Sequence, residues 1–412
     1  MADDVKVFGM KAEAGRWIYV ILGLIINICL GAVYSWSVFK KPLEELFSAS
    51  ATESSWPFIL FLAFFAILMP ITGPFLDKFG PKLFTILGGI IVGIGWILGG
   101  KSTGMTQLAI YYGIIGGIGV GIAYNCPIGV AGRWFPDKRG LAVGLTVLGF
   151  GLSALITAPL ARSMIASVGP LATMFQFGIA FLIIIVILGL PLKFPPAGWK
   201  PAGWNPPAAA GGKADFTASQ MLSTGSFYGV WLCYIIGTLA GLMAIGVAAP
   251  VGQELFALDA TSAAMFVSIF AVFNGIGRPI FGALVDKISA RNTAALSFVI
   301  IFIAAILLGK FSGSGSTSLY GICFSLLWLC LGGWLAIGPA ATGAYFGIKY
   351  YGPNYGIVFT AYGIGAIVGN LLAGKLRDLT GSYVSVFFPY VTVLAVIGFV
   401  IALLLMRPPR KA

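Results

Sequence analysis

The segment Gly73-Pro-Phe-Leu-Asp77-Lys78-Phe-Gly80-Pro-Lys82 has a second copy in Gly282-Ala-Leu-Val-Asp286-Lys287-Ile-Ser-Ala-Arg291. Each copy follows a long apolar run and places an Asp-Lys pair before a further basic residue. A second similarity pairs Thr146-Val-Leu-Gly149-Phe-Gly151 with Thr360-Ala-Tyr-Gly363-Ile-Gly365. Both pairs occupy corresponding places in the two halves of the chain, which predicts a fold built from two repeats in the same order.

The composition of the 412-residue chain is typical of an integral membrane protein. Hydrophobic residues make up 59% of it and charged residues 9%, and the mean hydropathy is +0.98. A helix needs about 20 apolar residues to cross the hydrocarbon core of a bilayer. We expect twelve such spans, near residues 17–39, 56–76, 82–100, 107–131, 140–161, 171–192, 226–249, 262–285, 292–309, 318–346, 353–374 and 384–406. The sequence therefore predicts an all-α membrane protein with twelve transmembrane helices in two pseudo-symmetric halves of six.

The basic residues are divided unequally between the two sides that these spans define. Of the 25 Lys and Arg residues, 17 fall on the side of the termini, 7 on the other side, and Arg278 inside a span. By the positive-inside rule, both termini are expected to be cytoplasmic. The net charge of +12 is then explained by topology and by anionic lipid headgroups, without nucleic acid as a partner.

The first apolar run has full span length and lacks a small-residue cleavage site, so we expect no cleavable signal peptide. The short tails and short central linker favour a prokaryotic protein of the cell membrane. We expect it to work as a monomer.

A Pro- and Gly-rich segment separates the sixth and seventh spans. It contains Pro195, Pro196 and Pro201 and a duplicated Pro-Ala-Gly-Trp sequence, which cannot form a membrane helix. We therefore predict an N-terminal half at 1–193, a cytoplasmic linker at 194–225 and a C-terminal half at 226–412. Six plus six spans with parallel repeats is the pattern expected of a secondary transporter whose site lies between the halves at mid-membrane.

The chain offers little for metal or redox chemistry. It has no His, and its five Cys residues all fall in predicted spans, where they act as small apolar side chains. We expect no disulfide framework, no metal site and no cofactor.

Arg278 is the one ionisable residue that the sequence places inside an apolar run, in Phe273-Asn-Gly-Ile-Gly-Arg-Pro279. A cation at bilayer depth costs about 3 kcal/mol on insertion scales, so such residues usually face the interior of a bundle and bind something. All 13 Asp and Glu residues are expected in loops or at helix ends, so a buried carboxylate partner is not evident. The pattern favours an anion-binding role over a purely structural one, in which backbone carbonyls would satisfy the guanidinium.

The repeated Asp-Lys loop resembles the signature of the major facilitator superfamily. Within it, Arg133-Trp-Phe-Pro-Asp-Lys-Arg-Gly140, Tyr34-Ser-Trp36, Met221-Leu-Ser-Thr224 and Asn274-Gly-Ile-Gly-Arg-Pro279 resemble the branch of monocarboxylate transporters and oxalate/formate antiporters. The resemblance covers essentially the whole chain. It implies a carrier, and it identifies Arg278 with the carboxylate-binding arginine of the eighth helix.

Three positions depart from the pattern of that branch. Tyr362 stands where the oxalate exchangers have a lysine, so a dicarboxylate would meet one cation instead of two, which favours a monoanion. Tyr34 and Asn274 stand where the animal lactate carriers have a lysine and an aspartate credited with proton coupling. Neither group titrates near neutral pH in apolar surroundings, so a coupled proton would need another group or the substrate's own carboxyl.

Further candidates for substrate binding come from the resemblance. Tyr124 matches a cavity tyrosine of the oxalate branch, and the adjacent Asn125 gives the fourth span a polar face; space-filling and an interhelical hydrogen bond are the alternatives for the two. Apolar residues stand where the oxalate exchangers often have polar or larger groups, although core packing explains any single one: Phe359, Leu145, Phe150, Leu331 and Leu335. A short aliphatic tail fits such a wall.

The two Asp-Lys loops are expected to act as a latch. Asp77 with Lys78, and Asp286 with Lys287, lie at the ends of the second and eighth spans. Contacts made in only one orientation of the halves bias the conformational equilibrium. The alternative is positive-inside charge beside a turn at Gly80.

The sequence thus predicts a carrier of short monocarboxylates such as lactate or pyruvate, working by alternating access with a proton. A carboxylate exchanger of the oxalate/formate type is the alternative within the same class. A membrane enzyme is not favoured, because the sequence offers no catalytic group of residues at membrane depth. A transport-inactive sensor is not favoured either, because it would be expected to carry a long soluble output domain.

Overall fold

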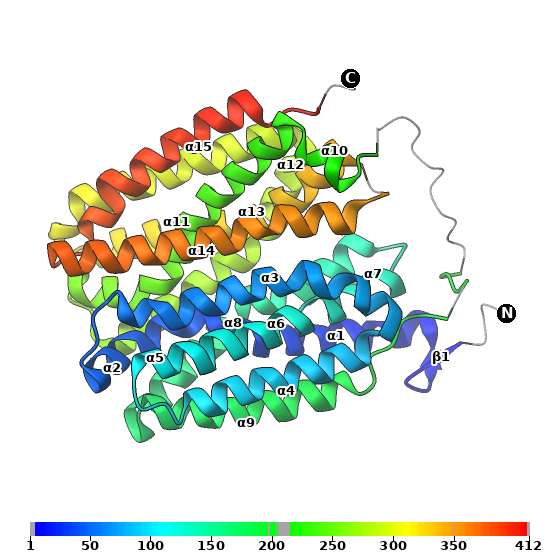
Figure 1. Cartoon of the computed structure of the whole chain (residues 1–412), viewed down its shortest axis with the longest axis horizontal. Helices are drawn as coiled ribbons and strands as arrows, with labels where there is room; N and C mark the ends of the chain where they lie inside the picture. The colour runs from blue at the N-terminus through cyan, green and yellow to red at the C-terminus, as the bar shows by residue number, and fades with distance from the viewer. Residues whose placement is uncertain (1–4, 197, 203, 205–214, 348, 410–412) are drawn as a thin grey trace.

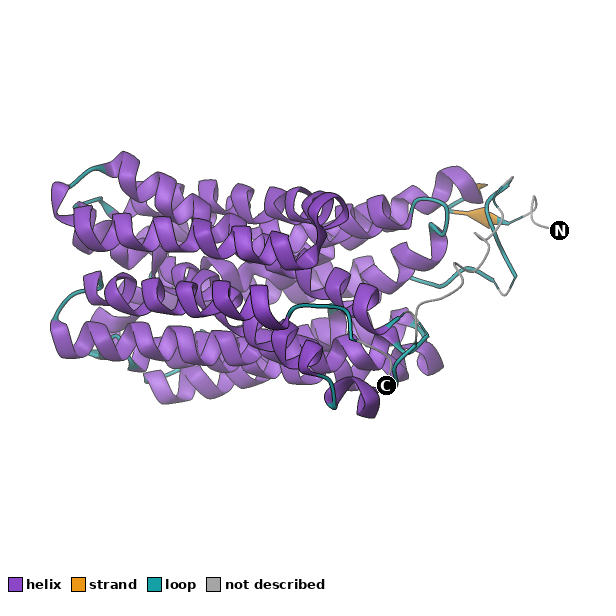
Figure 2. Cartoon of the chain, turned by 90° about the horizontal axis from the view of Figure 1, so that it is seen from above, coloured by secondary structure: helices purple, strands orange, loops and turns teal. Residues whose placement is uncertain are grey.

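The molecule is a bundle of long helices that run roughly along one direction (Figures 1 and 2). The computed structural model describes residues 5–409 except 197, 203, 205–214 and 348, so part of the predicted linker lies outside the described residues. The described chain begins and ends at one end of the bundle, which we call the termini end. The opposite end is called the distal end.

The helices before and after the predicted linker form two neighbouring groups, the first half and the second half (Figure 1). The first half contains β1 (Lys6–Val7), β2 (Met10–Lys11), α1 (Ala12–Leu30), η1 (Gly31–Ser35), α2 (Trp36–Phe47), η2 (Glu53–Ser55), α3 (Trp56–Phe79), α4 (Pro81–Gly99), α5 (Met105–Leu108), η3 (Ala109–Gly116), α6 (Gly117–Ala123), α7 (Asn125–Trp134), α8 (Arg139–Val168) and α9 (Pro170–Gly189). Helix α10 (Ala218–Leu222) lies within the predicted linker. The second half contains α11 (Gly225–Phe256), α12 (Ala260–Phe311), η4 (Ser312–Ser314), α13 (Thr317–Phe346), α14 (Tyr351–Thr380), η5 (Val386–Val391) and α15 (Thr392–Leu405). The antiparallel pair β1–β2 precedes the first helix and was not predicted.

The helices agree with the predicted spans. Within the described chain, 11 helical segments are long and apolar enough to cross a membrane. The longest, Ala260–Phe311, has 52 residues and is broken at Ser289, so it carries the eighth and ninth predicted spans. A continuous helix of that length would measure about 78 Å, far more than a hydrocarbon core of about 30 Å. The all-α membrane fold is therefore confirmed.

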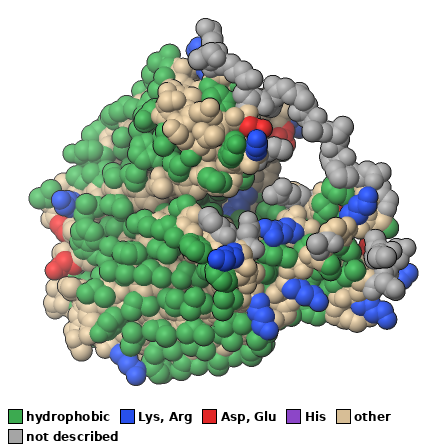
Figure 3. All heavy atoms as spheres, turned by 45° about the vertical axis from the view of Figure 1, so that its right-hand side comes forward, with side chains coloured by type: hydrophobic (Ala, Val, Ile, Leu, Met, Phe, Trp, Pro, Cys, Tyr) green, Lys and Arg blue, Asp and Glu red, His purple; other side chains and the backbone are tan. Residues whose placement is uncertain are grey.

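The surface of the bundle suits a bilayer. Large aliphatic side chains point outward along the helices, and the left and lower part of the molecule in Figure 3 is mainly hydrophobic, whereas most Lys and Arg side chains lie over its right-hand part. Examples are Ile67, Ile71, Ile183, Ile187 and Val396. Soluble proteins rarely expose so large an apolar surface to water, whereas a lipid bilayer accommodates it. The chain is therefore a multi-pass membrane protein.

The two Asp-Lys loops share one backbone conformation. Gly80, between α3 and α4, has φ 83° and ψ 165°, and Ser289, at the matching place of the second copy, has φ 77° and ψ 157°. Glycine adopts this region freely, whereas a residue with a Cβ is strained there. The repeat seen in the sequence is therefore a repeat of structure, kept at Ser289 at the cost of strain.

We expect Ser289→Gly to stabilise the protein by about 1 kcal/mol, because relief of strain exceeds the added freedom of the unfolded chain. Thermal unfolding in detergent, followed by circular dichroism, measures the change. Ser289→Ala is the matched control, since it removes the hydroxyl and keeps the Cβ. Equal stabilisation by both substitutions would contradict the backbone explanation.

The first helical segment is longer than predicted and contains buried charges. It runs without a break from Ala12 to Phe47 through α1, η1 and α2, so Arg16 and Lys40 lie inside it. Both are buried: the Arg16 guanidinium binds Asp137, and Lys40 Nζ donates a 3.0 Å hydrogen bond to Ser55 Oγ. Arg16 and Lys40 thus flank the predicted apolar run at 17–39, and their polar partners let the helix continue past both ends of that run.

The Arg16–Asp137 pair fastens the α7–α8 loop to α1 at the termini end. Nη1 and Nη2 of Arg16 lie 2.6 and 2.8 Å from the two carboxylate oxygens, and Nη1 also donates to the Trp134 carbonyl at 2.9 Å. The hydrogen bonds from Arg16 hold the pKa of Asp137 below its ordinary value.

We expect Asp137→Asn to destabilise the protein by about 3 kcal/mol, because it leaves a buried guanidinium without its counter-ion. The stabilisation from the pair is fully present above the ordinary aspartate pKa of about 3.9 and is lost as the pH falls through the lower folded pKa. Thermal unfolding at neutral pH checks the substitution, with Glu13→Gln on the same helix as control. Equal losses in both variants would contradict this account.

Candidate functional site

Arg278 lies on α12 at the contact between the halves. Its Nη1 donates a 2.8 Å hydrogen bond to the backbone carbonyl of Val147 on α8. Its Nε and Nη2 are buried and make no hydrogen bond of normal geometry in the described part of the chain, while the Tyr124 hydroxyl is close enough to interact with the guanidinium. Buried donors without partners are costly, and a guanidinium offers five of them in a planar fork. The backbone therefore satisfies only part of this cation, and the remaining donors fit an anion.

Three phenols gather near this guanidinium. The hydroxyl oxygens of Tyr34 on η1 and Tyr362 on α14 lie 2.9 Å apart, a hydrogen bond that joins the two halves. Tyr124, between α6 and α7, is a neighbour of Arg278, and the charge of Arg278 acts on the phenols of both Tyr34 and Tyr124. The structure thus brings together four residues predicted from far apart in the sequence.

Aromatic rings surround the phenols. Phe150 packs edge-on against Tyr34 at 5.1 Å between ring centroids. Phe65 contacts both Tyr124 at 5.1 Å and Tyr362 at 5.9 Å, and Phe359 stacks on Tyr362 at 5.0 Å. The result is a small apolar enclosure with hydroxyl groups and one cation, where charge-assisted hydrogen bonds are strong.

A close crossing of α12 and α13 positions Asn274, one turn before Arg278. A Cβ at Gly332 would lie 2.0 Å from the Asn274 carbonyl oxygen, so only glycine allows this approach. The Asn274 side chain donates a 3.3 Å hydrogen bond to the Trp328 carbonyl, and its Oδ1 is buried without a partner in the described structure. The amide is therefore held in place with one acceptor free.

Asn125 and Leu145 are less closely tied to this cluster. The Asn125 amide donates a 3.3 Å hydrogen bond to the Met69 carbonyl, which is the interhelical bond considered as its alternative role. Leu145 is half-buried on α8, packed against the core.

The latch residues lie at the termini end. Lys78, Asp286 and Lys287 are exposed, and Lys78 rests over the Phe79 ring at 5.2 Å. The side chain of Asp77 lies outside the described residues. The latch therefore stays a prediction.

The distal end is closed by contacts that the sequence did not indicate. Lys41 of α2 lies 3.3 Å from Glu254 of α11, which also accepts a 2.8 Å hydrogen bond from Arg377 of α14. The carboxylate of Asp378 accepts hydrogen bonds from the backbone of Ala51 at 3.0 Å and Thr52 at 2.9 Å. The contacts of Lys41 with Glu254 and of Asp378 with Ala51 and Thr52 link the first half to the second, so the distal ends of the halves are joined.

Some residues of the cluster were missed. Phe65 and Trp328 lie in long apolar runs, and ring size alone does not separate a site wall from core packing. The Val147 carbonyl has no signal in the sequence, because any residue supplies the same backbone oxygen. Trp328 lies 6.4 Å from Tyr34 between ring centroids and was not singled out.

The arrangement can bind an anion and offers little else. Among the described residues, no group of three His, Cys, Asp or Glu side chains is placed to hold a metal ion. The cluster around Arg278 consists of phenols, an amide and hydrocarbon rings. Such a site discriminates ligands by charge, size and hydrogen bonding.

Comparison with known proteins gives consistent results. The model of the Major Facilitator Superfamily matches residues 18–332 and 230–412. The oxalate:formate antiporter of Oxalobacter formigenes is 30% identical over 89% of this chain and 86% of its own length. Monocarboxylate transporter 4 of Gallus gallus is 26% identical over 92% of this chain and 80% of its own length.

A solved structure has the same fold. A bacterial homologue of the human lysosomal transporter Spinster, in an inward-facing and occupied conformation, superposes with a TM-score of 0.71 at 16% identity. The match covers 95% of this chain and 97% of that one.

Proposed function

Because the chain belongs to the Major Facilitator Superfamily and is a transporter, not an enzyme, we propose that it carries short monocarboxylates such as lactate or pyruvate across the membrane. It does so by alternating access, together with a proton. The names of two relatives describe carriers of oxalate and formate or of monocarboxylates, and the proposal assigns a substrate of the same chemical kind to this chain.

The observation that carries the proposal is the pair of unpartnered donors on Arg278. Nε and Nη2 are buried beside Tyr34 and Tyr124, and a carboxylate can accept from both at once. A hydroxyl or keto group next to the carboxylate of the substrate can form a hydrogen bond with one of the nearby tyrosine hydroxyls. The rings of Phe65, Phe150 and Phe359 supply apolar surface that a short aliphatic tail could contact.

A single cation at the site supports a monoanion over a dianion. Tyr362 contributes a phenol bonded to Tyr34, where the resemblance implies a lysine in oxalate exchangers. A second carboxylate would then be desolvated without a counter-charge, which is costly. For this reason lactate and pyruvate are preferred here to oxalate.

The contacts between the two halves provide a physical basis for alternating access. Glu254 and Asp378 join the halves at the distal end, while Arg278 reaches across to Val147 at the centre. A bound carboxylate competes for the Arg278 donors and so alters the balance between orientations. The latch residues Lys78 and Asp286, with their neighbours Asp77 and Lys287, would contribute the corresponding contacts at the termini end.

The orientation follows from the charges. With both termini cytoplasmic, the distal end, where contacts join the two halves, faces outward. A prokaryotic cell membrane is the proposed location. The proton travels on the substrate carboxyl or on a group outside the Arg278 cluster, since Tyr34, Tyr362 and Asn274 are poor acids.

Uptake of labelled L-lactate into proteoliposomes tests the proposal. Accumulation driven by an inward proton gradient in empty vesicles is the expected result. Uptake only in vesicles preloaded with a carboxylate would replace symport by exchange. No uptake of L-lactate or pyruvate in either condition, with folded protein in the vesicles, would overturn the substrate assignment.

A further inference from the structure

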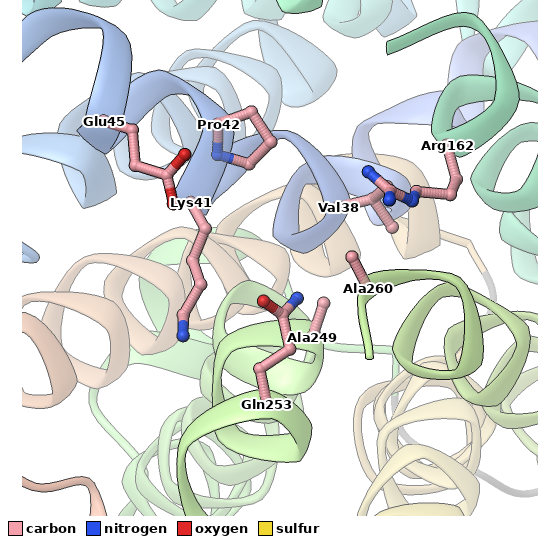
Figure 4. A pocket seen from close by; sticks show the side chains of 8 residues that line it. All are labelled: Val38, Lys41, Pro42, Glu45, Arg162, Ala249, Gln253 and Ala260. Atoms are coloured by element: carbon pink, nitrogen blue, oxygen red, sulfur yellow. The ribbon is translucent and has the colours of Figure 1, made fainter. Parts of the chain in front are cut away.

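A polar cavity lies at the distal end, away from the Arg278 cluster. It has a volume of about 120 Å³ and opens between α2 and α8 of the first half and α11 and α12 of the second (Figure 4). Its lining combines charged, amide and small apolar side chains: Val38, Lys41, Pro42, Glu45, Arg162, Ala249, Gln253 and Ala260. Nothing in the proposed transport site uses this cavity.

Positive charge predominates around the opening. Arg162 points from α8 toward Val38 of α2, while Lys41 and Gln253 flank the opening from α2 and α11 (Figure 4). Glu45 is the acid in the lining. Glu254, next to the cavity, is shared between Lys41 and Arg377, so it does not neutralise both of them.

Arg162 is the cation with free hydrogen-bonding capacity. Its Nε is buried without a hydrogen-bond partner, and Arg162 forms no ion pair within the described ranges of the chain. A guanidinium in this state is matched by the planar oxygen pair of a carboxylate. The Gln253 amide can donate to the same ligand, and Val38, Pro42 and Ala249 provide a wall for a short hydrocarbon group.

We propose that this cavity is an outer anion site that binds a short carboxylate at the distal mouth of the carrier. The proposal rests on the proposed function for its ligand class. Both halves line the cavity, so it has this shape only while the distal contacts are made. A carboxylate bound there therefore stabilises the distal-closed state.

Equilibrium binding of labelled L-lactate to the purified full-length protein tests the site. Wild type is expected to show two classes of site. Arg162→Gln should lower the affinity of the outer site for lactate by about tenfold or more and leave the affinity of the Arg278 site unchanged. Arg278→Gln should lower the affinity of the Arg278 site and leave that of the outer site unchanged. Lys310→Gln removes an exposed charge near the distal end of α12 without touching the cavity, and it should keep both sites.

The possible outcomes separate the two proposals. A single site that disappears in Arg278→Gln and is unchanged in Arg162→Gln would overturn the outer site and leave the proposed function intact. A single site lost only in Arg162→Gln would overturn the assignment of Arg278. Equal weakening by Arg162→Gln and Lys310→Gln would show a general effect of charge and overturn the outer site as well. No lactate binding to folded wild type would overturn both.

Discussion

Arg278→Gln is expected to reduce L-lactate transport by about 100-fold or more, because it removes the only cation of the central cluster and leaves a bound carboxylate buried without a counter-charge. Arg278→Lys keeps the charge and loses the planar fork. It should retain partial activity, about tenfold below wild type. Initial rates of labelled uptake into proteoliposomes, normalised to the amount of inserted protein, measure both effects.

The two variants together separate binding from folding. Arg278 also donates to the Val147 carbonyl, so its removal loosens one contact between the halves. Thermal unfolding of both variants reports on that contact. Transport in Arg278→Gln near the wild-type rate would contradict the role assigned to the guanidinium. An equal loss of lactate uptake in the two variants would mean that the planar donor geometry of the guanidinium matters as much as its charge.

Tyr362→Lys is expected to shift the preference of the site toward dicarboxylates. The Tyr362 hydroxyl is bonded to Tyr34, which lies within the influence of the Arg278 charge. A lysine there adds a second cation to the enclosure, and a charge-assisted hydrogen bond of about 1.5–3 kcal/mol corresponds to tenfold or more in affinity. Oxalate should then inhibit labelled lactate uptake at about one tenth of the concentration that wild type needs.

Tyr362→Gln is the matched control for this substitution. It removes the phenol and the hydrogen bond to Tyr34 without adding charge, so oxalate should compete no better than in wild type. If oxalate competes equally with lactate uptake in the Lys and Gln variants, the second-cation argument fails. A gain in both would instead point to the loss of the Tyr34–Tyr362 bond.

The overall fold could be predicted because hydrophobicity and repetition are local signals. Apolar runs of span length and the two Asp-Lys loops determined the helices and their order, and the shared backbone of Gly80 and Ser289 confirms that the loops correspond. The ends of helices were predicted less well. Lys40 lies inside the first helical segment because Ser55 meets its ammonium, and that contact joins elements that the sequence keeps apart.

The central cluster could be predicted in part for a similar reason. Arg278 stands out chemically in an apolar run, and the resemblance supplied Tyr34, Tyr124 and Tyr362. The partners of Arg278 could not be predicted, because Val147 contributes a backbone oxygen and Phe65 resembles any buried ring. The contacts at the distal end were missed as well. The ion pairs of Glu254 with Lys41 and Arg377 can be recognised only when α2 and α14 are placed beside α11.

An experimental structure of the protein with L-lactate bound tests the central claim most directly. The account predicts that the lactate carboxylate accepts hydrogen bonds from Nε or Nη2 of Arg278, within the enclosure formed by Tyr34, Tyr124 and Tyr362. The lactate hydroxyl should meet one of these phenols. Lactate bound elsewhere, with the Arg278 donors still unpartnered, would contradict it.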